Sequence, residues 1–229
     1  MVLPRTLEPE VMDTVEEAVD YDSMDHSTVN RVFVQDLLAF LQDAGITARA
    51  LKVLDLGTGT ALIPIELLQH SQTIGPIFAC DLSLEMLKLA AKHLSALPLG
   101  NQIIPVFCDA KKLPIPDDSV DLIISNSIVH HIPEPIAIFH EMRRCVSQNG
   151  AVFVRDLLRP ESAQAAEHLV QTYCGQENPH QQKMFRESLH AALTIDEVRN
   201  LTEEAGCKSA VVTQTTDRHW TLTWTRRSG

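Results

Sequence analysis

Short apolar runs rich in β-branched residues alternate with longer amphipathic stretches through the middle of the chain. Five runs are predicted to be strands, and they begin at Leu51, Ile77, Ile103, Val120 and Ala151. Three stretches between them have the apolar spacing of helices, namely Ala61 to His70, Leu84 to Leu97 and Pro135 to Val146. This alternation is typical of a parallel sheet covered by helices, so the sequence predicts a doubly wound α/β fold.

Two further segments depart from this alternation. Ser27 to Ala44 is predicted to be a long amphipathic helix ahead of the first strand, and an acidic stretch from Val11 to Asp25 precedes it. Arg159 to Leu193 is too long for a simple connection, and its prolines and glycine predict two helices with a break between them. A capping box at Thr194 then predicts another helix, and two strands follow it.

Composition supports one globular domain over the 229 residues. Hydrophobic residues make up 45% of the chain and charged residues 21%, close to the average for such domains. No stretch approaches the roughly 18 apolar residues of a membrane span, and the acidic start lacks the order of a secretion signal. We therefore expect a cytoplasmic protein.

Charge and cysteine spacing exclude several kinds of partner. The formal net charge is −11 and no basic stripe occurs, so we expect neither nucleic acid nor a membrane to be a partner. The 5 cysteines include no C-x-x-C pair, which favours buried thiols over a zinc site. These features leave the oligomeric state open.

The first predicted strand runs directly into a glycine turn, Asp55-Leu56-Gly57-Thr58-Gly59. Without a Cβ atom at either glycine the backbone can lie against a ligand, and a valine at Gly57 is expected to fill that space in a protein that still folds. Such a turn occurs in both NAD-binding and S-adenosylmethionine-binding folds. Leu62 stands where the dinucleotide pattern has its third glycine, and Asp55 suits an ammonium group better than a pyrophosphate.

Aspartates end the next two predicted strands. Asp81 is placed to accept hydrogen bonds from both hydroxyls of a ribose. Asp109 is a candidate acceptor for an exocyclic adenine N–H, with the backbone N–H of Ala110 on a ring nitrogen and Leu82 on one face of the base. An ammonium site, a diol acceptor and an adenine site in this order favour an aminoacyl nucleoside over a dinucleotide.

The glycine turn resembles the first motif of class I S-adenosylmethionine-dependent methyltransferases, with Ala61 where many members have a third glycine. The aspartates at 81 and 109 and the run from Ser125 to Ile132 resemble later motifs, which adds Asn126 to the cofactor residues. The resemblance covers Asp20 to Thr225. It is closest to the small-molecule branch, methyltransferase type 11, which includes quinone-biosynthesis C-methyltransferases.

This resemblance implies a single methyltransferase domain over residues 1–229, with a Rossmann-like sheet of seven strands whose last strand is antiparallel. Residues 1–50 would form an N-terminal helical lid and residues 51–156 the cofactor-binding core. Residues 157–193 would be a helical insertion, and residues 194–229 a closing helix with two strands. S-adenosylmethionine is then the cofactor and a small molecule the methyl acceptor.

Three histidines are candidates for a general base. His130 and His131 follow strand four, at the edge where a doubly wound sheet binds ligands. Neighbours on an extended backbone point opposite ways, so one of the two is expected to face the cleft. The alternative for each of them is a buried histidine that is hydrogen-bonded to the backbone and is not a base. His26 and Tyr21 lie in the segment that covers the cofactor in related methyltransferases, and a solvated acidic face is the alternative there.

The remaining polar groups near the predicted cleft are assigned no catalytic role. A metal site built from the histidine pair and His26 lacks supporting spacing, and no metal is predicted. Arg155, Asp156 and Arg159 follow strand five, where they would meet an acidic substrate or pair within the protein.

The sequence therefore predicts an enzyme that transfers a methyl group from S-adenosylmethionine to a small molecule by in-line displacement, with His131, His130 and His26 as catalytic candidates. Two alternatives from other classes remain. One is a catalytically silent protein that binds the same cofactor or an interaction partner. The other is a nucleotide-dependent oxidoreductase, which Leu62 disfavours.

Overall fold

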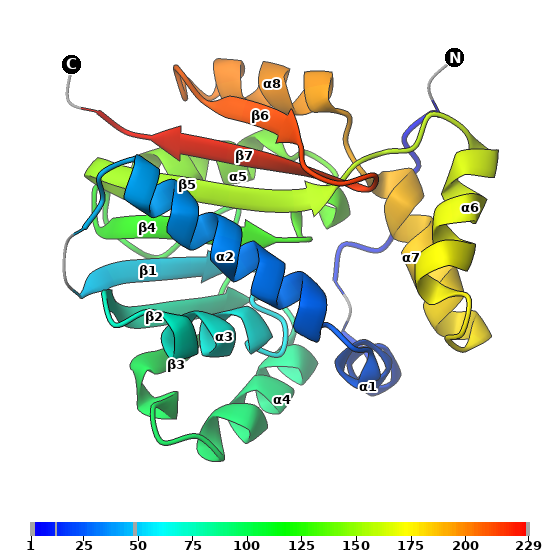
Figure 1. The fold of residues 1–229 in the computed structure, drawn as a ribbon, viewed down its shortest axis with the longest axis horizontal. Coiled ribbons are helices and arrows are strands. Elements are labelled where there is room, and N and C mark those ends of the chain that lie inside the picture. The colour runs from blue at the N-terminus through cyan, green and yellow to red at the C-terminus, as the bar shows by residue number, and fades with distance from the viewer. Residues whose placement is uncertain (1–2, 12, 48–49, 228–229) are drawn as a thin grey trace.

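A computed structural model describes residues 3–11, 13–47 and 50–227, and these residues form a seven-stranded sheet with helices on both faces (Figure 1). The strand order is β3-β2-β1-β4-β5-β7-β6. The strands are β1 (Leu51–Leu56), β2 (Ile74–Asp81), β3 (Ile103–Phe107), β4 (Val120–Asn126), β5 (Val146–Leu157), β6 (Val211–Gln214) and β7 (His219–Thr225). Neighbouring strands from β3 to β5 are parallel, whereas β7 runs antiparallel to both β5 and β6. This arrangement confirms the predicted doubly wound fold with an antiparallel last strand.

The helices also follow the predicted pattern, with ends that differ by one or two residues. They are α1 (Val15–Ser23), α2 (Ser27–Asp43), α3 (Leu62–His70), α4 (Leu84–Ser95), α5 (Ile136–Cys145), α6 (Ala163–Cys174), α7 (Pro179–Ala191) and α8 (Ile195–Glu204), with short 3₁₀ turns η1 (Gly100–Gln102) and η2 (Val129–His131). The break between α6 and α7 confirms the two helices predicted after strand five. No helix in the described ranges is long and apolar enough to cross a membrane.

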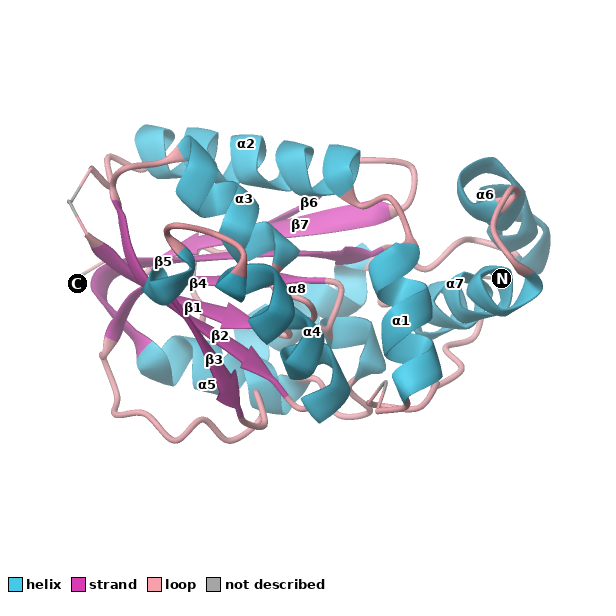
Figure 2. Ribbon diagram, turned by 90° about the horizontal axis from the view of Figure 1, so that it is seen from below, coloured by secondary structure: helices cyan, strands magenta, loops and turns pink. Residues whose placement is uncertain are grey.

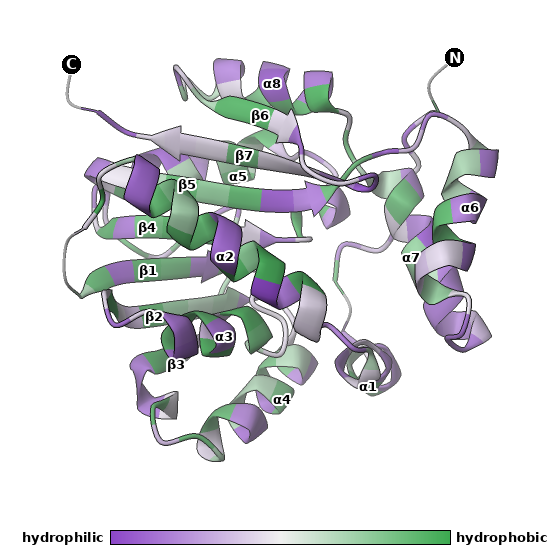
Figure 3. Ribbon diagram, viewed as in Figure 1, coloured by the Kyte–Doolittle hydropathy of each residue, from purple (hydrophilic) through white to green (hydrophobic). Residues whose placement is uncertain are grey.

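Two apolar layers hold the sheet between its helices. Alternate residues of β1 enter different layers, because neighbouring side chains of a strand point to opposite faces. Val53 packs in the layer with α2 and α3, and Leu54 packs in the layer with α5 and α8. In Figure 3 the central strands are largely apolar in colour, whereas α2 carries both apolar and hydrophilic residues, as expected of a helix with one buried face. Both faces of the sheet are therefore buried, as a parallel sheet requires.

The carboxyl ends of the parallel strands meet at one edge of the sheet, beside α1, α6 and α7 (Figures 1 and 2). The N-terminal segment, residues 3–11, also lies at this edge. Its Arg5 guanidinium donates to the carbonyl oxygens of Ala191 at 2.7 Å and Ile132 at 2.9 Å, so the segment joins α7 to the turn after β4. A doubly wound sheet binds its ligands at this edge.

Candidate active site

Two adjoining cavities open at the carboxyl edge of the sheet. Cavity A has about 330 Å³ and cavity B about 570 Å³, both counted with the solvent space at their mouths. Gly57, Asp81 and Leu82 line both cavities, whereas Asp109 and Ala110 line cavity A alone. Cavity B adds Gly59, Tyr21, Asn126 and His131. The structure thus brings most of the predicted cofactor residues together around one continuous cleft.

The glycine turn between β1 and α3 depends on residues with positive φ. Gly57 has φ +71° and Gly59 has φ +54°. The backbone N–H groups of Gly57 and Thr58 both donate to the carbonyl oxygen of Cys80 at 2.9 Å, which ties the turn to the end of β2. Thr58 itself lines neither cavity. Thr58 shapes the turn through this hydrogen bond and through its carbonyl oxygen, which accepts from the N–H of Ala61 at 3.0 Å.

The structure changes the reason for a glycine at position 57. A Cβ atom there would lie 2.6 Å from Cδ1 of Ile128, which is too close for any real contact. A valine at this position would therefore meet the protein as well as the space predicted for a ligand, so its effect on binding alone stays a prediction. Gly59 differs, since its nearest neighbour would be Cε1 of Tyr21 at 3.7 Å.

We expect Gly57→Ala to lower the free energy of unfolding by roughly 1 to 3 kcal/mol more than Gly45→Ala. Gly45 is a matched control, because it has the same φ of +71° and no atom within 4 Å of the position that a Cβ atom would take. The control therefore measures the cost of the backbone conformation alone. Urea denaturation of both variants gives the difference, and equal losses would contradict the close contact with Ile128.

Asp81 ends β2 and organises the turn as well as the cleft. Its Oδ2 accepts from the N–H of Gly59 at 2.7 Å and its Oδ1 from the N–H of Ser83 at 2.8 Å. Burial raises the pKa of Asp81 above its usual value, and these hydrogen bonds oppose the shift. Each carboxylate oxygen has two lone pairs, so both can accept a further hydroxyl from a diol.

Asp109 lies across cavity A and is held by Lys111. Its Oδ1 accepts from the backbone N–H and from Nζ of Lys111, both at 2.9 Å. Burial raises the pKa of Asp109, but Lys111 reverses the shift and holds the pKa below its usual value. Lys111 also pairs with Glu10 of the N-terminal segment. Neither residue was predicted from the sequence, and together they close the adenine side of the predicted site.

Among the buried oxygens without a hydrogen-bond partner in the described residues, two lie at the ends of strands at this edge. They are Oδ2 of Asp55, at the end of β1, and Oδ1 of Asn126, at the end of β4. Asp55 is 3% exposed, and burial together with the nearby Asp81 raises its pKa to about 7. A buried acceptor without a donor is costly, so these atoms fit a ligand that supplies an ammonium or other N–H groups.

Tyr21 of α1 forms one wall of cavity B, with His26 behind it. The two rings stack with centroids 4.5 Å apart, and Nε2 of His26 lies 2.8 Å from the carbonyl oxygen of Tyr21. Burial, with the charges of Asp81 and Asp55, raises the pKa of Tyr21 to about 12, so its hydroxyl stays protonated. His26 lines neither cavity. Its position suits support of Tyr21 better than proton transfer.

The histidine pair lies on a 3₁₀ turn rather than on an extended strand. The prediction that the two side chains point opposite ways is therefore wrong, and the rings lie with centroids 4.2 Å apart at an angle of 33°. His131 lines cavity B. His130 is 2% exposed, and its Nδ1 lies 2.5 Å from Oδ1 of Asp156. Of the three candidate bases, His131 alone reaches the cleft.

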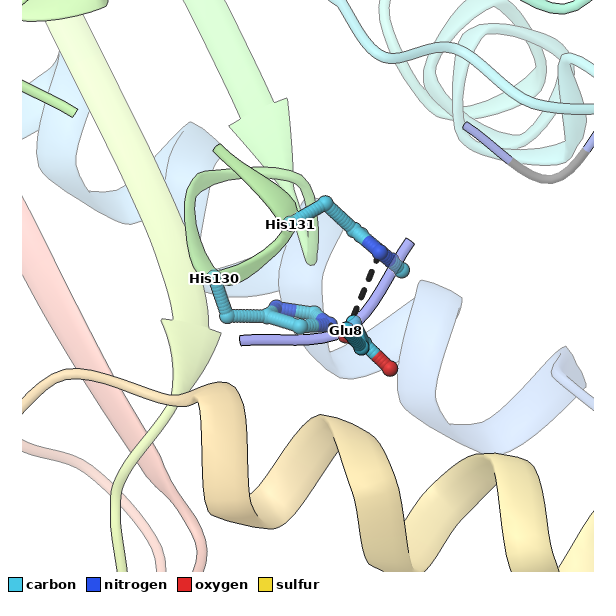
Figure 4. A group of neighbouring side chains, drawn as sticks. All are labelled: Glu8, His130 and His131. Carbon is cyan, nitrogen blue, oxygen red and sulfur yellow. Dashed lines mark ion pairs between the residues drawn. The ribbon is translucent and has the colours of Figure 1, made fainter. Parts of the chain in front are cut away.

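Glu8 of the N-terminal segment meets both histidines (Figure 4). Its Oε1 lies 3.2 Å from Nδ1 of His131 and 3.5 Å from Nε2 of His130. Burial raises the pKa of Glu8, whereas burial and the neighbouring His130 lower the pKa of His131 to about 3. Sequence reasoning missed Glu8, because nothing in the local pattern separates it from the other acidic residues near the N-terminus.

Of the three charged residues predicted to follow strand five, Arg155 and Asp156 lie within β5 and only Arg159 follows it, and all three pair within the protein. Arg155 donates to Asp36 at 2.6 Å, and Arg159 donates to Glu197 at 2.6 Å. Asp156 is fully buried, where it accepts from His130 and from the backbone N–H of Val129 at 2.6 Å. The structure thus favours the internal pairs over the acidic-substrate alternative.

Comparison with known proteins agrees with this geometry. Residues 54–154, from β1 through β5, match a protein-family model described as "Methyltransferase domain". This central region of the chain is similar to methyltransferase domains. The match contains the glycine turn, Asp81, Asp109 and the histidine pair, whereas Glu10 and Tyr21, which also line the cleft, lie outside it.

Curated relatives of this methyltransferase domain differ in the acceptor that their names give. Malonyl-[acyl-carrier protein] O-methyltransferase of Marinomonas sp. is 33% identical over 132 residues, which are 58% of this chain and 45% of the relative. Demethylmenaquinone methyltransferase of Porphyromonas gingivalis is 28% identical over 110 residues, 48% of this chain and 45% of the relative. The chain spans less than half the length of these two relatives.

Solved structures share the fold over more of the chain. The plantazolicin methyltransferase BamL, solved with SAH, has a TM-score of 0.74 at 16% identity and covers 93% of this chain and 91% of its own. A SAM-dependent methyltransferase from Aquifex aeolicus has a TM-score of 0.68 at 19% identity, covering 93% of this chain and 98% of its own. At these identities the likeness establishes the fold of the methyltransferase domain alone.

Proposed function

We propose that this protein transfers a methyl group from S-adenosylmethionine to a small-molecule acceptor. The observation that carries the proposal is the order of groups along the cleft. An unpaired buried carboxylate at Asp55 adjoins the glycine turn, Asp81 follows at the end of β2, and Asp109 and Ala110 line the far cavity. This order matches an amino acid, a ribose and an adenine in one ligand.

Each part of the cofactor has candidate partners on this chain. Asp55 and Asn126, each with an unpaired oxygen, suit the ammonium end, and the backbone at Gly59 leaves room for it. Asp81 suits the ribose hydroxyls. In cavity A, Leu82 suits one face of the adenine, with Asp109 and Ala110 on its edge. When bound, S-adenosylmethionine supplies an electrophilic methyl group on its sulfonium.

The protein's task in such a transfer is to align the acceptor with that methyl group and to exclude water. Alignment requires a reacting distance of about 3 Å. We assign the lid to α1, the N-terminal segment and the pair α6 and α7. On one side, the carbonyl oxygen of Asp20 in α1 accepts from Nε2 of Gln181 in α7 at 3.0 Å. On the other side, Oδ2 of Asp22 in α1 lies 3.3 Å from Nε2 of His93 in α4. These contacts hold α1 over the cleft, where a dry site strengthens electrostatic effects.

His131 is the candidate base for an acceptor with a hydroxyl or an acidic carbon. It lines cavity B, and its low pKa keeps the imidazole unprotonated. Its position rather than its basicity supports the assignment, because a general base is most efficient with a pKa near the working pH. His130 and His26 are then positioning residues. The ring of His130 packs beside that of His131, and the ring of His26 packs behind that of Tyr21. An amine acceptor in its neutral form would need no base.

The acceptor is proposed only as a small molecule. The relatives' names include O-methyl and N-methyl transfer, so they do not select one atom. The net charge of −11 argues against nucleic acid as acceptor. All five cysteines are free, which suits the reducing environment of the cytoplasm that we propose as the location.

A thermal-shift panel with S-adenosylmethionine, its demethylated product, NAD and ATP tests the proposal. At a concentration 100 times the dissociation constant, a ligand of the folded state adds about 2.7 kcal/mol to its stability. We expect the first two ligands to raise the melting temperature and the last two to leave it unchanged. Stabilisation by NAD alone would favour the oxidoreductase instead, and binding without methyl loss across an acceptor panel would favour the silent protein.

A further inference from the structure

Three metal-ligating side chains converge where the N-terminal segment crosses η2 (Figure 4). Oε1 of Glu8, a ring nitrogen of His130 and a ring nitrogen of His131 all lie within 4.8 Å of one another. The three side chains are 8%, 3% and 12% exposed, so the cluster is shielded from bulk water. Glu8 is more than 120 residues from the two histidines along the chain, so tertiary structure builds this cluster.

The spacing of the ligand atoms fits a tetrahedral ion. Zinc binds imidazole nitrogen and carboxylate oxygen at about 2.0 to 2.2 Å, which places two ligands of a tetrahedron about 3.3 to 3.5 Å apart. The distances from Oε1 of Glu8 are 3.2 Å to Nδ1 of His131 and 3.5 Å to Nε2 of His130. No large movement is needed to bring both pairs onto the edges of such a tetrahedron.

Two of the three ligand atoms have no other role in the described structure. Oε1 of Glu8 and Nδ1 of His131 are buried and have no hydrogen-bond partner. Buried polar atoms without partners are rare and costly, and here two of them face each other. A bound cation would satisfy both at once.

The groups behind the ligands have the arrangement that orients metal ligands in proteins. Nδ1 of His130 donates to Oδ1 of Asp156 at 2.5 Å, which directs Nε2 toward Glu8. The second oxygen of Glu8 accepts from Oγ of Ser188 on α7 at 3.1 Å, which leaves Oε1 for the ion. A carboxylate behind a ligating histidine and a hydrogen bond behind a ligating carboxylate are typical of zinc sites.

We propose that Glu8, His130 and His131 bind one divalent transition-metal ion of the zinc class. Two imidazoles and a carboxylate suit Zn²⁺ and Co²⁺, whereas Mg²⁺ and Ca²⁺ prefer all-oxygen ligands. The ion would fasten the N-terminal segment to the turn after β4 and leave one coordination position for a further ligand. This site goes beyond methyl transfer and does not require it. While the ion is bound, His131 is a ligand and does not act as the base for an acceptor.

Titration of the full chain, free of any affinity tag, with Zn²⁺ and separately with Co²⁺ tests the site. We expect one ion per chain, and for Co²⁺ the visible absorption of a tetrahedral ion without the intense near-ultraviolet band of a thiolate ligand. Glu8→Gln, which keeps an acceptor for Ser188, and His131→Ala should each weaken Zn²⁺ binding at least about 100-fold. Asp156→Asn should weaken it about 10- to 100-fold by loosening His130.

His168→Ala is the matched control, because His168 lies on the exposed surface of α6 and should leave ion binding unchanged. Circular dichroism of Glu8→Gln verifies that the variant folds. The proposal is overturned if the wild type binds neither ion. That result is expected if Nε2 of His130 carries a proton and pairs with Oε1 of Glu8 in place of an ion. It is also overturned if Glu8→Gln binds as tightly as the wild type, or if a thiolate band places the ion on cysteines. S-adenosylmethionine binding, measured in the same samples, reports separately on the proposed function.

Discussion

Asp81→Asn should weaken S-adenosylmethionine binding by at least about 100-fold, which corresponds to about 2.7 kcal/mol. The carboxylate accepts from the backbone N–H groups of Gly59 and Ser83, and its remaining lone pairs are the candidate acceptors for the ribose diol. An asparagine keeps one oxygen and puts an N–H₂ group where a second acceptor is needed. Charge-assisted hydrogen bonds are roughly twice as strong as neutral ones, so losing them at both hydroxyls has a large effect.

Asp121→Asn is the control for this prediction. Asp121 also accepts from a backbone N–H, that of Lys52 at 2.9 Å, and from Oγ of Ser147 at 3.3 Å. It lies near the amino end of β4, away from the cleft. Isothermal titration calorimetry should therefore give wild-type affinity for Asp121→Asn. If Asp81→Asn unfolds cooperatively and still binds within threefold of the wild type, the diol assignment is wrong.

The fold could be predicted from the sequence because burial on two faces leaves a clear pattern. Strands of a parallel sheet are apolar throughout, and their covering helices are amphipathic, so the two kinds of segment differ in period. The main error lies at the start of β5, which begins at Val146 rather than at Ala151. Polar residues at 147–149 conceal the continued strand, and pairing with β4 shifts register between Val120 and Leu122.

The candidate cofactor residues could be placed at one cleft from the sequence because most of them lie at or just after a strand end. Their position depends on local order in the chain, and a parallel sheet brings all its carboxyl ends to one edge. Ala61 is another residue whose role follows from its place in the local sequence. It adopts φ +64° at the start of α3, where a glycine would avoid the strain, so the resemblance to a three-glycine motif has a backbone cause.

The catalytic side of the cleft could not be predicted in the same way. Ser127 adopts φ +57° after β4 and turns the chain into η2, which places both histidine rings together. Serine gives no sign of such a turn, whereas glycine or asparagine would. Glu8 is a second case, because its contact with the histidines depends on how residues 3–11 cross the finished fold. Periodicity carries no information on such long-range contacts.

Asp55→Asn should make the unliganded protein more stable at pH 8, and by a much smaller amount at pH 5. Burial raises the pKa of Asp55 to about 7, from an ordinary value near 3.8. A raised carboxyl pKa means that the folded protein holds the proton more tightly than the unfolded chain. The resulting stability is present in full below about pH 4 and is lost as the pH rises through 7. The loss is on the order of a few kcal/mol, and an asparagine does not undergo it.

The same substitution should weaken cofactor binding, with the opposite dependence on pH. An ammonium group beside Oδ2 of Asp55 would pair with the ionised carboxylate, so wild-type affinity should rise as the pH increases through about 7. Asp55→Asn should lose at least tenfold in affinity at pH 8 and little at pH 5. Because Asp55→Asn removes a charge that the empty site tolerates poorly, stability and binding move in opposite directions.

Urea denaturation without ligand and calorimetry with S-adenosylmethionine, each at pH 5 and pH 8, measure both effects. Asp121→Asn again serves as the control, because both oxygens of Asp121 already have donors, and it should show neither the gain in stability nor the loss of affinity. A stability gain in Asp55→Asn of equal size at both pH values would show that packing, rather than the buried charge, causes it. Unchanged affinity at pH 8 would place the ammonium elsewhere. The two measurements together therefore distinguish a carboxylate kept for a cationic ligand from one that is only buried.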